Sequence, residues 1–170
     1  MDGITYIEDV ISNPLELYLK LEKSVNWDDQ MQARKTASYG VAYNYSQMSY
    51  AFQEFLPELE ELLDIIEKNL GFRPNNCLIN FYLHGKAKMG WHSDQTDILH
   101  EGTGVAIISL GDTRSLRFRE IEDKENKIDF PLPAGSLIYM TQKTQDLWQH
   151  SVPKLAESKA RMSLTFRSIK

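Results

Sequence analysis

The second half of the chain is divided into short segments that are either apolar or alternate between apolar and polar residues. They cover residues 77–83, 105–110, 115–119, 127–130, 136–140 and 162–167. Turns rich in glycine, proline and charged residues separate them, so each segment is predicted to be a strand. Many short strands joined by turns are typical of a sandwich or jelly roll, in which a small core is shared by two sheets.

Two helices are predicted before these strands. Asn13 and Pro14 form an N-cap and first helical position, and leucines follow at residues 15, 17, 19 and 21. A second helix is predicted from Pro57 to its stop at Gly71, with apolar residues at spacings of three and four. The expected fold class is therefore α+β, with residues 1–75 supplying helices and residues 76–170 the strand core of a single domain. Residues 27–49 show no sustained period and are expected to form loops or hairpins over that core.

Length and charge exclude several classes of protein. A chain of 170 residues fits one domain, and no apolar run approaches the roughly 18 residues of a membrane span. The lone Cys77 and the absence of a signal-like N-terminus predict a cytoplasmic protein, which we expect to be a monomer. A net charge of −5 argues against a surface that binds phosphates everywhere, so any nucleic-acid contact must be local. The acidic segment 54–67 is predicted to be a solvated helix face.

A candidate metal site consists of two histidines and one carboxylate. His92 and Asp94 stand at i and i+2, which places them on the same face of a strand. His150 follows a predicted strand and can fold back beside them in a jelly roll. Three such ligands leave open positions of the kind that non-haem Fe(II) oxygenases use, whereas zinc usually has four ligands. The alternative for the His-x-Asp triplet is a surface hydrogen bond, which is also the interpretation for His84 and His100.

The last predicted strand offers cations for an anionic ligand. Arg161, Ser163, Thr165 and Arg167 alternate with apolar residues and therefore share one face. An arginine binds a carboxylate through two parallel hydrogen bonds, and two buried arginines would be costly without an anion nearby. The alternative is a pair of solvated surface arginines.

Taken in order, these elements resemble the AlkB family of Fe(II)/2-oxoglutarate-dependent dioxygenases. The matching segments are Asn80-Phe81-Tyr82, His92-Ser93-Asp94, His150 to Pro153, and Arg161 to Arg167. The resemblance implies a double-stranded β-helix, Fe(II) held by His92, Asp94 and His150, and 2-oxoglutarate and O2 as cosubstrates. It also implies that Asn80 and Tyr82 hydrogen-bond 2-oxoglutarate, that Arg161 binds its distal carboxylate, and that Arg167 lies near the end that chelates iron.

The resemblance extends upstream to a nucleotide-recognition lid. Arg34 to Gly40, followed by Tyr43-Asn44-Tyr45, is similar to the lid of the DNA-repair members. In that interpretation Tyr45 stacks on a flipped-out base, and Arg34, Lys35, Tyr39 and Tyr43 help to hold the strand. Core packing beneath a loop is the alternative for the tyrosines.

Two positions depart from the family pattern. Ser163 stands where many members have an asparagine beside the cosubstrate. Thr96 stands where repair members have an acidic residue that selects a cationic base, and Asp97 is next to it. We include Ser163 in the expected cosubstrate site and Thr96 in the expected substrate site.

Two functions are compatible with these observations. The first is oxidative N-demethylation of alkylated bases in DNA or RNA, which yields formaldehyde, succinate and CO2. The second is hydroxylation of a small molecule or protein side chain by the same fold, which the acidic charge and Thr96 favour. A binding module with a vestigial site is disfavoured because all the expected metal ligands are present.

Overall fold

The computed structural model describes residues 1–31, 34–45 and 48–170, with the side chain of Tyr45 outside the described part. The elements run in the following order: β1 (Ile4–Ile7), α1 (Pro14–Ser24), β2 (Lys35–Gly40), β3 (Tyr43–Tyr45), β4 (Met48–Tyr50), α2 (Pro57–Leu70), β5 (Asn76–Tyr82), β6 (Met89–His92), β7 (Val105–Gly111), β8 (Arg114–Glu120), β9 (Lys127–Leu132), β10 (Leu137–Met140), α3 (Gln142–Leu147), β11 (Trp148–Val152) and β12 (Arg161–Arg167).

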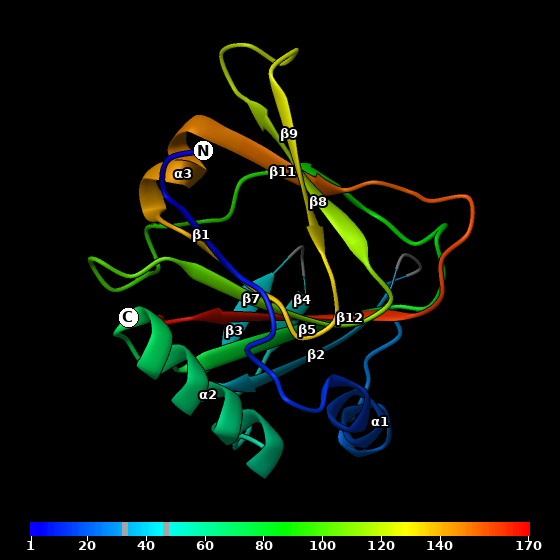
Figure 1. Ribbon diagram of the computed structural model, residues 1–170. Coiled ribbons are helices and arrows are strands. Elements are labelled where there is room, and N and C mark those ends of the chain that lie inside the picture. The colour runs from blue at the N-terminus through cyan, green and yellow to red at the C-terminus, as the bar shows by residue number, and fades with distance from the viewer. Residues whose placement is uncertain (32–33, 46–47) are drawn as a thin grey trace.

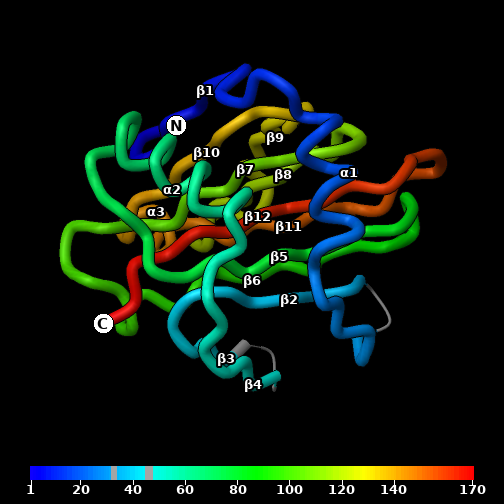
Figure 2. The backbone as a smooth tube through the Cα atoms, turned by 90° about the horizontal axis from the view of Figure 1, so that it is seen from below, coloured from blue at the N-terminus to red at the C-terminus, as the bar shows by residue number. Residues whose placement is uncertain are grey.

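The strands form two antiparallel sheets and a small hairpin. The large sheet has the order β1-β10-β7-β12-β5-β2, the small sheet has the order β6-β11-β8-β9, and β3 pairs only with β4. Helices α1 and α2 lie on one side of the large sheet, and the small sheet lies on the other side (Figure 1). Seen from the helical side, α1 and α2 cross over the strands of the large sheet (Figure 2). The predicted α+β jelly roll with helices on one side is therefore confirmed.

Alternation along the central strands divides the core into two. On β12, the residues Met162, Leu164 and Phe166 belong to a cluster that packs against the helices. The residues between them point to the other face, where a second cluster fills the space beside the small sheet. Period-2 alternation thus lets one strand serve an apolar core and a polar cavity at the same time.

The helix boundaries follow the predicted signals. Pro14 is at the start of α1, although the side chain of Asn13 makes no capping hydrogen bond. Helix α2 begins at Pro57 and ends before Gly71, which has a left-handed φ of 80°. No helix within the described residues is long and apolar enough to span a membrane.

The N-terminal part contributes more to the sheet than the sequence predicts. Strands β1 and β2 form the two edges of the large sheet, so its strands do not all come from residues 76–170. The expectation of loops and hairpins for residues 27–49 is right for the β3–β4 hairpin and wrong for β2. Its sequence, Lys35 to Gly40, contains small and polar residues that give little strand signal, and its pairing with β5 supplies the stability.

A candidate metal and cosubstrate site

Three predicted metal ligands meet at the edge of the small sheet. His92 is the last residue of β6, and His150 lies directly opposite it on β11 as its Cα partner. Asp94 lies beyond the end of β6, in the segment that follows the strand. Its Oδ1 atom is 3.5 Å from Nε2 of His92 and 3.7 Å from Nε2 of His150. One ligand atom from each residue lies within 4.8 Å of the others, so a single metal ion can be bound by all three.

Hydrogen bonds and burial prepare these groups for a metal. Nδ1 of His92 donates to the carbonyl of Gly90 at 2.8 Å, so in the neutral imidazole the lone pair lies on Nε2, the atom that would bind a metal. Burial raises the pKa of Asp94, but the opposing charges of Arg167, His150 and His92 outweigh it and hold this pKa well below its usual range. The carboxylate is therefore ionised, as a metal ligand must be.

The two histidines differ in basicity. Burial lowers the pKa of His92, but the hydrogen bond and charge of Asp94 outweigh this effect and raise the pKa above its ordinary value. Burial lowers the pKa of His150 to about 4, against the attraction of Asp94. His150 is thus neutral and ready to bind a metal near neutral pH. At His92 a metal competes with a proton once the pH falls below the raised pKa of that residue.

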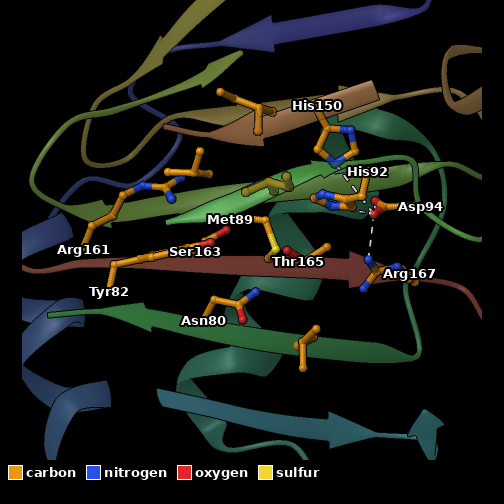
Figure 3. A pocket seen from close by; sticks show the side chains of 14 residues that line it. Asn80, Tyr82, Met89, His92, Asp94, His150, Arg161, Ser163, Thr165 and Arg167 are labelled. Carbon is orange, nitrogen blue, oxygen red and sulfur yellow. Dashed lines mark ion pairs between the residues drawn. The ribbon is translucent and has the colours of Figure 1, made fainter. Parts of the chain in front are cut away.

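Two buried arginines mark the two ends of one cavity. Arg161 and Tyr82 lie at one end, and Arg167 lies at the other beside Asp94 (Figure 3). Nη2 of Arg167 is 3.4 Å from Oδ2 of Asp94, and its guanidinium lies 4.8 Å from the ring centre of Tyr43. Nη2 of Arg161 donates to Oγ of Ser109 at 2.9 Å. The predicted sharing of one face by Arg161, Ser163 and Arg167 is confirmed, because all three line this cavity.

The polar atoms of these arginines match an elongated anion. Within the described part of the chain, Nε and Nη1 of both Arg161 and Arg167 are buried without a hydrogen-bond partner. Orphaned donors of this kind are costly unless a ligand accepts from them. Because the metal ligands and Arg161 lie at opposite ends, the cavity fits a dicarboxylate that chelates a metal at one end and contacts a cation at the other (Figure 3). These residues therefore fit Fe(II) together with 2-oxoglutarate.

The remaining predicted cosubstrate residues line the same cavity. Asn80 and Tyr82 on β5 and Ser163 on β12 all line the cavity, and Asn80 is the Cα partner of Ser163. Oδ1 of Asn80 accepts from Nε of Arg34 at 2.7 Å. This bond orients the amide so that its Nδ2 donor is available to an acceptor in the cavity. Their roles toward 2-oxoglutarate stay predictions.

A second, open depression adjoins the metal ligands. It is lined by Arg34, Tyr43 and Gln95, among others, together with His92 and Asp94. Arg34 and Tyr43 are thus close to the metal site, as the lid interpretation requires. The prediction for Tyr45 concerns a side chain outside the described residues.

Two predicted substrate residues, Lys35 and Tyr39, belong to β2. Lys35 and Tyr39 are the Cα partners of Phe81 and Cys77, which pack in the cluster beneath the helices. Tyr39 is only 3% exposed, and its hydroxyl accepts weakly from the backbone of Asn26 at 3.4 Å. Tyr39 thus packs in the core, which is the alternative given for the tyrosines, and Lys35 shares its parity on β2. The substrate role of Lys35 stays a prediction.

Thr96 lies next to this depression in the sequence, directly after Gln95. Among the described residues, the lining of the depression includes Gln95 but neither Thr96 nor its neighbour Asp97. The backbone carbonyl of Thr96 accepts from Leu99 in a turn, at 3.0 Å. The expectation that Thr96 contacts the substrate stays a prediction.

Several residues of the site were not predicted. Met89 lines both the cavity and the depression, Ser109 binds Arg161, and Gln145 binds the backbone of Asp94. Period-2 parity within 105–110 could have identified Ser109 as facing the cavity. Met89 is three residues before His92 in the same strand, where simple alternation places it on the opposite face. The contact between Gln145 and Asp94 joins segments that are distant in sequence, and no local pattern indicates it.

Comparisons with known proteins agree with this geometry. Residues 15–167 match the family model described as the 2OG-Fe(II) oxygenase superfamily. The rat Alpha-ketoglutarate-dependent dioxygenase alkB homolog 3 is 35% identical over 170 residues, which cover 88% of this chain and 58% of the relative. The human DNA oxidative demethylase ALKBH2 is 30% identical over 177 residues, which cover 91% of this chain and 68% of the relative.

A solved structure shares the fold. The structure of OsALKBH1 superposes with a TM-score of 0.76 at 18% identity, covering 99% of this chain and 97% of that chain. At this identity the likeness supports the fold alone. The chain spans little more than half the length of the rat relative.

Proposed function

The chain belongs to the AlkB family of Fe(II)/2-oxoglutarate-dependent dioxygenases, and from that premise we propose that it demethylates alkylated bases of DNA or RNA. The single observation that carries the proposal is the elongated cavity with the triad of His92, Asp94 and His150 at one end and the orphaned donors of Arg161 at the other. This arrangement suits a metal-chelating dicarboxylate. The names of the relatives, which include a DNA oxidative demethylase, support the choice of substrate.

The overall reaction uses one 2-oxoglutarate and one O2 for each N-methyl group. Succinate, CO2 and formaldehyde leave, and the base nitrogen keeps the electron pair of the broken N–C bond. Bound Fe(II) supplies the oxidising chemistry, in which one oxygen atom enters succinate and the other hydroxylates the methyl carbon. The hydroxymethyl product then loses formaldehyde without further oxidation.

The protein's own residues position the reactants. His92, Asp94 and His150 would hold the metal where the cavity and the depression meet, since His92 and Asp94 line both. Arg161, with Asn80 and Tyr82 beside it, orients the cosubstrate. Arg34 and Tyr43 line the depression through which a base approaches the metal. Extrusion of the base from the stack is required for duplex substrates only. Action as a cytoplasmic monomer stays a prediction.

A substrate panel tests the proposal. Purified protein with Fe(II), 2-oxoglutarate and ascorbate is incubated with oligonucleotides that contain 1-methyladenine or 3-methylcytosine, and formaldehyde and succinate are measured. We expect formaldehyde release that depends on the oligonucleotide and is absent in His150→Ala. Succinate formation that is stimulated only by small amines or peptides would refute the nucleic-acid substrate and favour the small-molecule or protein oxygenase.

A further inference from the structure

Asp94 is held differently from the two histidines of the metal site. His92 and His150 are opposite each other in paired strands, so the sheet fixes both backbones. Asp94 lies two residues beyond His92, after β6 has ended. Its carboxylate must nevertheless face both imidazoles, and metal sites tolerate displacements of only about 0.5 Å. A restraint from outside the sheet is therefore needed.

The side chain of Gln145 supplies such a restraint. Its Oε1 atom accepts a hydrogen bond from the backbone N–H of Asp94 at 2.8 Å. Gln145 belongs to α3 and is only 4% exposed. Its Nε2 atom donates to Sδ of Met140 at 3.6 Å, a weak acceptor that fixes which end of the amide faces Asp94. One residue earlier, Oγ of Ser93 donates to the carbonyl of Trp148 at 2.8 Å.

Helix α3 is itself firmly anchored. The side chain of Thr141 caps its N-terminus by accepting from the N–H of Thr144 at 3.4 Å. The N–H of Thr141 donates to the carbonyl of Gly3 at 3.0 Å, which ties the helix to the segment before β1. Gln145 thus connects Asp94, which lies in a segment without strand pairing, to a helix that these hydrogen bonds hold in place.

We propose that Gln145 is a positioning residue for the metal centre, which orients the Asp94 carboxylate through the backbone N–H of that residue. The inference rests on the proposed function, because it assumes that His92, Asp94 and His150 bind a metal. Outer-shell partners of metal ligands typically change metal affinity by about 10–100-fold.

The test compares two glutamines of the same helix. Gln145→Met removes the acceptor and keeps the length of the side chain, whereas Gln142→Met is the matched control. Nε2 of Gln142 donates to the carbonyls of His100 and Thr103 at 3.1 and 2.7 Å. Both carbonyls lie in the segment between β6 and β7, which also contains Asp94, but away from the metal ligands. Mn(II) affinity is measured by electron paramagnetic resonance, and the melting temperature is measured in parallel.

We expect Q145M to bind Mn(II) about 10–100-fold more weakly than the wild type. Q142M should lower the melting temperature, because it removes the two hydrogen bonds of Gln142. Its Mn(II) affinity should stay within about threefold of the wild type, because those bonds lie outside the metal centre. Gln145→Glu keeps an acceptor of the same length and should restore most of the affinity. If Q145M does not fold, Q145A replaces it in the comparison with Q145E.

Two results would count against the inference in different ways. Wild-type affinity in Q145M, or an equal loss in Q145M and Q145E, would overturn the role of the hydrogen bond while leaving the metal site intact. A wild-type protein that binds no Mn(II) would instead overturn the proposed function, and the inference with it.

Discussion

His92 and His150 are direct partners across β6 and β11, with their ring centroids 4.3 Å apart. Two of the three metal ligands therefore stand on one rung of the small sheet, and removal of either leaves too few ligands for tight binding. We expect His150→Ala and Asp94→Ala to lose Mn(II) binding in calorimetric titration and to form no succinate. His84→Ala, which removes an exposed imidazole outside the site, is the control. Full activity of either site variant would show that the triad is misassigned.

Arg161 is a buried cation with no ion-pair partner among the described residues, and burial lowers its pKa to about 10. Arg161→Met should weaken 2-oxoglutarate binding by about 2–5 kcal/mol while Mn(II) still binds. The same substitution should raise the melting temperature of the cosubstrate-free protein, because it removes an uncompensated buried charge. Arg117→Met, on the exposed face of β8, controls for the loss of an arginine. Unchanged 2-oxoglutarate affinity in R161M would transfer the role to Arg167.

Metal affinity should depend on pH through His92. Its pKa is raised, so a proton competes with the metal as the pH falls through that value, and the apparent dissociation constant rises by about tenfold per pH unit. The pKa of His150 is lowered to about 4, so His150 adds no competition near neutrality. Mn(II) titrations between pH 6 and 8 should thus show the release of at most one proton. A dependence on two protons in this range would contradict the assignment.

A carboxylate introduced by mutation can favour a cationic base only where its side chain lines the depression. Gln95 lines it and Thr96 does not. Gln95→Glu should therefore raise the rate on 1-methyladenine relative to a neutral methylated base, by charge-assisted hydrogen bonding. Thr96→Asp should leave this ratio unchanged. Competition assays with both oligonucleotides measure the preference, and an effect of Thr96→Asp alone would mean that Thr96 contacts the base.

Two glycines with similar backbone angles should respond differently to substitution. Gly71, with φ of 80°, has no atom within 4 Å of an added Cβ, so Gly71→Ala should cost only the left-handed strain of about 1–2 kcal/mol. At Gly40, with φ of 84°, an added Cβ would lie 2.1 Å from the carbonyl oxygen of Asn75. Gly40→Ala should lose clearly more stability in urea unfolding. Equal losses would show that the backbone near Asn75 can adjust.

Local patterns predicted the elements that are long or strongly alternating. The strands β5, β7 and β12 lie within one residue of their predicted bounds, and α2 has the predicted start and stop. Helix α3 was not predicted because six largely polar residues contain no measurable period. Strand β2 was missed for want of apolar residues, and with it the parity that places Tyr39 in the core. The contact between Gln145 and Asp94 joins distant segments, so only the folded chain reveals it.

The alternation of side chains along β12 makes the cosubstrate site and the folding of the sheet depend on the same strand register. Arg161 and Arg167 face the cavity only because Met162 and Phe166 face the helices, and β12 is hydrogen-bonded to β7 on one side and β5 on the other. Insertion of a single residue at the start of this strand would turn the arginines toward the apolar core and the apolar side chains toward the cavity. Such a chain would lose its cosubstrate site and its fold together. Single substitutions around this strand are therefore compatible with the fold, but an insertion or deletion of one residue within it is not.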